Sequence, residues 1–205
     1  MIYFFDQSGD VIGYYGYLDA KSKEEYEEAK DAEIGWYPFA ELDDLDFSNC
    51  QNGLKVPLGS MAVVVTAHSD ATIVFSGEVR QEETPLKLVG GFKTYVGNCS
   101  PVDITLGDIK PNADFEFDAD MIYFFDKSGD VTGYYGYLDA KSKEEYEEAK
   151  DADIGWYPFA ELDDLDFSNC QNSLPVKAGD SFVVVTAHST ATLTIPPAVK
   201  PAKAE

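Results

Sequence analysis

Short runs of apolar and β-branched residues recur along the chain, and each run is bounded by glycine, proline, asparagine or aspartate. Runs of this length and composition are typical of β-strands. In the C-terminal half they cover Ile122–Phe125, Val131–Tyr137, Phe182–His188 and Ala191–Ile195. The valines at 183–185 are consecutive rather than alternating with polar residues, which predicts a strand covered on both faces. The pattern predicts a mainly β protein built of antiparallel β-sandwich or barrel-like modules.

Glycine-containing turns connect several of these runs. Asp126–Asp130 reads DKSGD and predicts a hairpin turn with a glycine in the left-handed conformation. Gly90 and Gly91 separate two further runs and predict a second tight hairpin. One amphipathic segment per module, SKEEYEEAKDA at Ser22–Ala32 and Ser142–Ala152, has the capping-box spacing of serine and glutamate and predicts a single short surface helix.

The chain repeats itself at a spacing of 120 residues. Met1–Cys50 recurs as Met121–Cys170 with three differences in fifty positions, and the likeness remains strong as far as Ser69 and Ser189. Arg80–Asp120 stands between the copies and has no counterpart before residue 1. Because a repeat defines the structural unit, we expect 1–76 to be an incomplete β-module that lacks its first third, 77–199 to be a complete β-module, and 200–205 to be a flexible tail or linker.

The incomplete copy predicts exposed apolar strands and an unpaired sheet edge. Three arrangements would cover these strands and pair this edge. The chain is cut from a longer array, a neighbouring subunit supplies strands to residues 1–76, or Arg80–Asp120 serves the first copy and leaves the second to be completed elsewhere. Strand addition joins subunits through main-chain hydrogen bonds.

The charge of the chain restricts its partners. With 38 acidic and 15 basic side chains the net charge is −23, which disfavours nucleic acid and anionic membrane surfaces. The sequence contains no apolar run of eighteen residues, so membrane insertion is not expected. A hydrophobic content of 44% is sufficient for packed cores.

The three cysteines permit two interpretations. Cys50 and Cys170 occupy the same position in the two copies, whereas Cys99 lies in the segment present once. A disulfide between Cys99 and Cys170 would leave Cys50 without a partner, or paired with another chain, and would indicate an extracellular location. Alternatively, all three are buried thiols in a reducing compartment.

Two groups of residues are candidates for ligand binding. The DxSGD loops alternate oxygen-bearing side chains as calcium loops do, although turn formation alone explains the same residues. The acidic ELDDLD stretches at Glu41–Asp46 and Glu161–Asp166 are a second candidate for calcium. The candidate calcium ligands of the DxSGD loops are Asp6, Ser8, Asp10, Asp126, Ser128 and Asp130.

Aromatic residues are dense near the hairpin and could present a platform for glycan rings, although we favour core packing and cross-strand pairing as the explanation. The platform residues would be Tyr14, Tyr15, Trp36, Tyr134, Tyr135 and Trp156. Each copy has one histidine, His68 or His188, at the end of a strand, and the sequence contains no nucleophile, zinc-protease, phosphate-loop or dinucleotide motif. We therefore expect a protein that is not an enzyme.

The segment LVGGFKTYVGNCSPVDITLGDI, followed by MIYFFDxSGD, GWYP and AGDxFVVV, resembles the modules of secreted bacterial surface proteins with tandem β-repeats. The likeness covers 77–199 fully and 1–76 in part. It implies an extracellular, non-enzymatic structural protein whose modules assemble head to tail into a surface fibre or layer, with a glycan- or calcium-dependent binding module as the alternative. It does not imply the disulfide, because Cys99 and Ser100 depart from the expected pattern.

Overall fold

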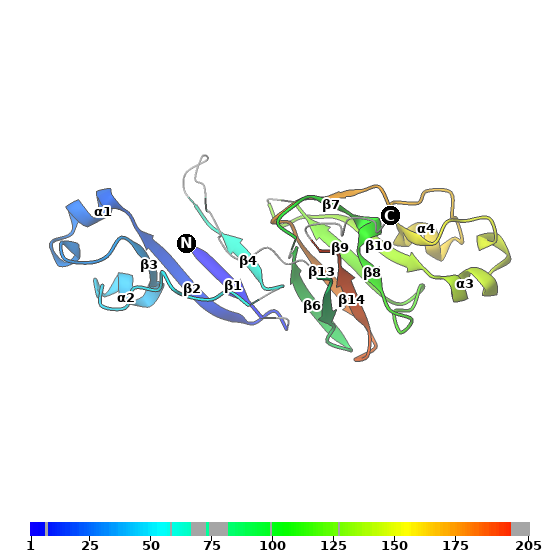
Figure 1. The fold of residues 1–205 in the computed structure, drawn as a ribbon, viewed down its shortest axis with the longest axis horizontal. Coiled ribbons are helices and arrows are strands. Elements are labelled where there is room, and N and C mark those ends of the chain that lie inside the picture. The colour runs from blue at the N-terminus through cyan, green and yellow to red at the C-terminus, as the bar shows by residue number, and fades with distance from the viewer. Residues whose placement is uncertain are drawn as a thin grey trace, which may run out of the picture. The chain divides into compact units, whose positions relative to one another are not determined.

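The computed structural model describes residues 1–6, 8–57, 59–66, 73, 82–98, 100–126 and 128–197 (Figure 1). The protein is mainly β, as the sequence predicts, and its described strands pair antiparallel without closing into a barrel. The chain divides into two compact units. The first unit contains Met1–Asp6 and Asp10–Phe75, and the second contains Gln7–Gly9 and Ser76–Glu205.

The first unit is built on one four-stranded sheet with the order β3-β2-β1-β4. Ile2 and Phe4 of β1 are both buried and lie on the sheet face that also carries Val64 of β4. The β1–β2 hairpin turns through Gly9, which has the left-handed φ of 88° that the sequence predicts for this loop. The strands of the first unit are β1 Ile2–Phe5, β2 Val11–Leu18, β3 Gly35–Pro38 and β4 Met61–Val64.

The second unit repeats this sheet and extends it by one strand. Its five-stranded sheet has the order β11-β10-β9-β13-β6, and the added strand β6 comes from the segment between the sequence copies. A three-stranded sheet, β5-β14-β8, and the two-stranded pair β12-β7 complete the unit. The strands are β5 Thr84–Lys87, β6 Phe92–Gly97, β7 Ile104–Thr105, β8 Lys110–Pro111, β9 Met121–Phe125, β10 Val131–Leu138, β11 Gly155–Pro158, β12 Pro175–Val176, β13 Ser181–Thr186 and β14 Thr192–Ile195.

The main core of the second unit lies where the five-stranded and three-stranded sheets meet. Leu86 of β5 and Leu193 of β14 belong to the same buried cluster as Ile122 of β9 and Val184 of β13. Val183 and Val184, which point to opposite faces of β13, are both fully buried. The predicted strand with two covered faces is therefore confirmed.

The glycine pair at 90–91 does not form the predicted hairpin. β5 precedes the pair and joins β14, whereas β6 follows it and joins β13, so the two strands enter different sheets. Gly91 has a φ of 77°, as a turn glycine should, but the turn carries the chain from one layer to the other. Local turn chemistry does not specify which sheet each flanking strand joins.

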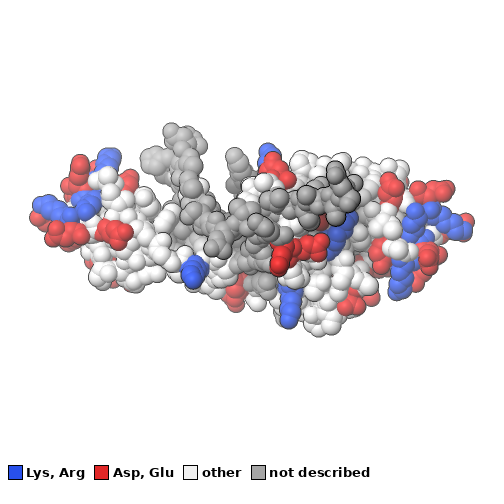
Figure 2. All heavy atoms as spheres, viewed as in Figure 1, with Lys and Arg blue, Asp and Glu red and all other residues white. Residues whose placement is uncertain are grey.

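The helical segments differ from the single helix predicted for each copy. The first helices, α1 Ala20–Glu25 and α3 Ala140–Glu145, begin at Asp19 and Asp139 instead of a serine, because each aspartate accepts a hydrogen bond from the serine N–H three residues on, at 2.7 Å. Extended backbone at Tyr26 and Tyr146 then ends each helix, and the short 3₁₀ helices η1 Glu27–Ala29 and η3 Glu147–Ala149 follow. Lysine and acidic side chains gather over these segments (Figure 2).

A second helix in each unit overlaps the acidic ELDDLD sequence. These helices are α2 Phe39–Asp43 and α4 Phe159–Asp163. Each ends with a leucine, Leu45 or Leu165, at a left-handed φ of 54°. The N–H groups of Leu45 and Asp46 donate to the carbonyls of Leu42 and Glu41, which is the Schellman pattern. Glycine is usual at this position, and its absence explains why the sequence did not reveal the helix end.

The helices in the described ranges are all too short or too polar to cross a lipid bilayer.

Asp120 holds the end of the inserted segment against the second copy of the repeat. Its carboxylate is fully buried, with one oxygen accepting the N–H of Ala187 at 3.0 Å and the other accepting the N–H of Glu116 at 2.8 Å. The hydrogen bond with Ala187 joins the inserted segment to the end of β13 in the second copy.

We expect Asp120→Asn to destabilise the second unit by about 1–3 kcal/mol, because an amide nitrogen cannot accept the second N–H and both groups become unsatisfied in the interior. Urea unfolding measures the change. Asp118→Asn is the control, since Asp118 is exposed, and an equal effect of both substitutions would contradict the anchoring role of Asp120.

Candidate functional site

The same side chains are exposed in the first unit and buried in the second. Val64 is 44% exposed, whereas Val184 is fully buried, and Tyr17 is 50% exposed against 7% for Tyr137. Val56, in the stretch before β4, is 40% exposed, although its equivalent Val176 in the second unit is fully buried. We call this set the acceptor face; it consists of Tyr17, Trp36, Val56 and Val64.

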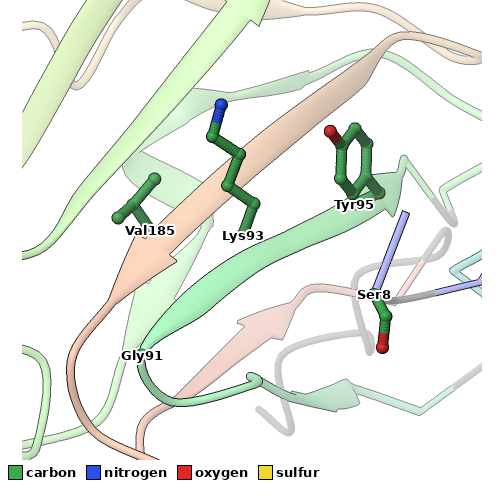
Figure 3. A pocket seen from close by; sticks show the side chains of 5 residues that line it. All are labelled: Ser8, Gly91, Lys93, Tyr95 and Val185. Atoms are coloured by element: carbon green, nitrogen blue, oxygen red, sulfur yellow. The ribbon is translucent and has the colours of Figure 1, made fainter. Parts of the chain in front are cut away.

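Strand β6 covers the sheet edge in the second unit. It pairs with β13 over six residues, with Val184 opposite Thr94 and Phe182 opposite Val96. Thr94 and Val96 are buried, while Lys93 and Tyr95 stand on the opposite face of β6 beside Val185 (Figure 3). The inward face of β6 therefore completes the core.

Trp156 shows how closely the inserted segment covers the second sheet. The indole N–H donates to the carbonyl of Ile109 at 3.0 Å, and the ring of Phe115 meets the indole edge-on at 5.7 Å. Trp156 is fully buried, whereas its equivalent Trp36 is only partly buried. Both partners of Trp156 lie in the segment for which the first copy has no equivalent in this sequence.

The acceptor face keeps the geometry of the covered sheet. Tyr17 and Trp36 pack edge-on with centroids 5.0 Å apart and planes at 61°, and Tyr137 and Trp156 do so at 5.1 Å and 67°. The backbone N–H of each tryptophan donates a hydrogen bond of 3.1 Å to the side-chain oxygen of Asn52 or Asn172. The open face is thus already arranged as it is when covered.

Phe117 makes a further contact that the first unit does not have. It lies 5.1 Å from the ring of Tyr146 and 6.0 Å from that of Phe167, and it joins the small core beside helices α3 and α4. The corresponding cluster of the first unit forms around Leu18, Ala29 and Tyr37. Without an equivalent of Phe117, Tyr26 is left 44% exposed.

Strand β4 is an edge of its sheet among the described residues, where its one partner is β1. The N–H of Val65 donates to the carbonyl of Met1 at 3.0 Å. Because antiparallel strands alternate their hydrogen-bonding direction, the N–H groups of Ala62 and Val64 point away from β1. They are in position to pair with a further strand.

The described part of the segment 80–120 serves the second copy. Its strands β5, β6, β7 and β8 pair with β14, β13, β12 and β14 respectively. The expectation that this segment could instead complete the first copy is therefore wrong. The physical reason is that the buried partners of Ile109, Phe115 and Val96 all lie in the second unit.

Cys170 does not form the predicted disulfide. Cys50 and Cys170 are both free thiols in the structure, and Cys99 lies outside the described residues. Each free cysteine instead packs in the small core of its own unit, where it shares a hydrogen bond with Tyr37 or Tyr157. Because this partner is part of the repeat, Cys50 does not depend on the segment 80–120, and the cysteines no longer argue for an oxidising compartment.

Aspartate side chains of the DxSGD loops are used to hold the turns. One carboxylate oxygen of Asp126 accepts the N–H groups of Ser128 and Asp130, at 2.8 and 3.0 Å. Asp6 accepts the N–H of Asp10 at 3.0 Å in the first copy. Within the described ranges, acidic, cysteine and histidine side chains do not gather in threes as a metal site would require. The oxygens predicted to bind calcium are thus arranged by turn formation.

The aromatic residues proposed as a platform divide between the two faces of their sheets. Tyr15 and Tyr135 pack edge-on against Phe4 and Phe124 beside the acceptor face or the main core. On the other face Tyr14 is stacked between Tyr3 at 4.4 Å and Phe39 at 4.5 Å, so that its ring faces are covered. A hydrogen bond with Tyr3 raises the pKa of Tyr14 to about 12. Of the six platform residues, Tyr134 is the most exposed, at 50%.

His188 contacts the inserted segment at the end of β13. Its Nε2 lies 3.2 Å from an Oε1 of Glu116. His68, its equivalent, lies outside the described residues.

Comparison with protein-family models, curated proteins and solved structures found no match to this chain. The resemblance to secreted β-repeat proteins therefore stays a prediction.

We expect the same substitution to have different effects in the two units. Val184→Ala should lower the free energy of unfolding of the second unit by about 2 kcal/mol, because it removes buried methyl groups and leaves a cavity. Val64→Ala, at the exposed equivalent, should change stability by less than about 0.5 kcal/mol. Denaturant unfolding of both variants tests this difference, and equal losses would show that Val64 is covered in solution.

Alkaline conditions should destabilise the small core of the first unit. Burial, followed by the hydrogen bond with Cys50, raises the pKa of Tyr37 to about 12. An unfolded tyrosine ionises near pH 10, so the stabilisation from Tyr37 is complete below pH 10 and is lost as pH rises towards 12. Tyr37→Phe should reduce the slope of stability against pH between 10 and 12, as measured by urea unfolding; an unchanged slope would contradict the assignment.

Proposed function

We propose that the protein is a non-enzymatic structural subunit of an extracellular fibre or surface layer, built of tandem β-sandwich modules that assemble head to tail. The observation that carries this proposal is the difference between two nearly identical sequences, one folded with a covered sheet and the other with an acceptor face and an open strand edge. An exposed edge of this kind is a template for pairing with another chain. The resemblance to secreted bacterial surface modules supports the extracellular location.

Self-association through β4 is the form of assembly that the contacts support. Strand addition supplies main-chain hydrogen bonds, and pockets for alternate side chains give the pairing its register. The acceptor face offers both, because the N–H groups of Ala62 and Val64 point outward from β4, and the side chains of Val64, Tyr17 and Trp36 lie on one face of the sheet. Inter-subunit strand complementation would bury these groups as β6 and the following residues bury their equivalents.

Binding of a glycan or of calcium is a weaker alternative. The rings of Tyr3, Tyr14 and Phe39 cover one another, which leaves their edges instead of their faces for a sugar. The Asp126 carboxylate already accepts two backbone N–H groups. Neither arrangement favours a ligand over a structural role, so we retain assembly as the proposed function.

Sedimentation velocity over a range of concentrations tests the proposal. We expect the chain to associate as concentration rises, and Ala62→Pro to suppress association, because proline removes an outward N–H while an edge strand tolerates it. Ala62→Ser keeps the N–H and should associate like the parent chain. A monomer at every concentration, or equal association of both variants, would contradict assembly through this edge.

A further inference from the structure

The covering of the second unit specifies what kind of partner fits the first. The two copies differ at three of fifty positions. The tyrosine–tryptophan pair, and the hydrogen bond from the tryptophan N–H to an asparagine, have the same geometry in both units. In the second unit these side chains are met by one continuous piece of chain that supplies an edge strand, an acceptor for the indole N–H and two aromatic rings. A partner of the same chemistry would therefore fit the acceptor face.

We propose, resting on the proposed function, that the acceptor face binds an extended donor segment with the pattern of residues 82–120. The donor strand adds antiparallel to β4, and residues farther along it close over Trp36 and Tyr26. The donor is not the segment 82–120 of a second folded copy, because that segment is held in its own unit by four strand pairings and by the buried Asp120.

The register of the donor strand follows from the equivalence of β4 and β13. Val184 lies opposite Thr94 and Phe182 opposite Val96, so the donor residues equivalent to Thr94 and Val96 should lie opposite Val64 and Ala62. The donor residues equivalent to Lys93 and Tyr95 then face away from the acceptor, as they do in β6 (Figure 3).

One position sets the acceptor apart from its covered equivalent. β13 carries Phe182, which packs at 5.6 Å against Phe124, whereas β4 carries Ala62 opposite Phe4. The smaller side chain leaves room that a larger donor residue opposite Ala62 would fill. The acceptor face therefore favours a donor with an aromatic residue at the position equivalent to Val96.

Three further donor groups have defined positions. The carbonyl equivalent to that of Ile109 accepts the indole N–H of Trp36, and a ring equivalent to Phe115 packs against the indole edge. A ring equivalent to Phe117 covers Tyr26, as Phe117 contacts Tyr146. Together with the strand, these contacts specify a segment that runs from the equivalent of Phe92 to that of Phe117, well beyond the short strand that simple edge pairing needs.

The test uses the full chain and a synthetic peptide of residues 82–120 with Cys99→Ser. Labelling the chain with 5-fluorotryptophan gives two fluorine signals, because Trp36 and Trp156 are its two tryptophans, and Trp36→Phe assigns them. At a chain concentration below that of self-association, we expect the peptide to shift the Trp36 signal saturably and to leave the Trp156 signal unchanged. A shift of Trp156 alone, or no shift, would overturn the proposal.

Peptide variants test the register. Val96→Gln places a polar amide against Ala62 and should weaken binding by about tenfold or more, since burying an unpaired amide costs about 1–3 kcal/mol. Lys93→Gln introduces the same side chain on the outward face and should change the affinity by less than about threefold, as expected of a surface substitution. Val96→Phe should bind more tightly than the parent peptide. Equal effects of the two glutamine variants, or weaker binding of Val96→Phe, would overturn the register.

This experiment separates the inference from the proposed function. Peptide binding by a chain that never self-associates would support the donor segment and refute homopolymer assembly. Association of the chain without peptide binding would do the reverse. Movement of the Trp156 signal during self-association would show that copies exchange their own segments 82–120, and would overturn the assignment of the donor to a different segment.

Discussion

Everything distinctive in this protein depends on how a twisted antiparallel sheet buries its apolar face. Trp156 is an example, because its buried indole N–H requires a hydrogen-bond acceptor. The carbonyl of Ile109 is that acceptor, and the ring of Phe115 packs edge-on against the indole. The same sheet in the first unit has its tryptophan and tyrosine in place without those partners. A single sheet buries little by itself, so the layer that covers it decides whether the unit is closed.

Local structure is set by the repeat and is independent of that covering. The aspartate caps of α1 and α3, the left-handed leucines and the tyrosine–cysteine contacts occur in both units. Each is formed by residues within the repeat itself. Tertiary covering changes the exposure of Val64 and Tyr17 and leaves their geometry almost unchanged.

The sequence was sufficient to predict the β class, the strand buried on both faces and the role of Gly9 as a turn residue, since these follow from hydrophobic pattern and backbone sterics. It failed where distant residues decide. Gly90 and Gly91 suggested a hairpin, but β5 and β6 separate into different sheets; Leu45 occupies a conformation typical of glycine; and the Cys99–Cys170 pairing rested on cysteine count. The covering by Ile109, Phe115 and Phe117 could not be read from spacing.

The matching angles of the two tyrosine–tryptophan pairs bear on kinetics. A surface whose side chains already hold their bound arrangement does not have to reorganise during an encounter, so the rate of docking is set by diffusion and orientation instead of by a slow structural change. Differences in affinity among donor segments would then lie mainly in their dissociation rates. The residue that a donor places opposite Ala62 would change the dissociation rate more than the association rate.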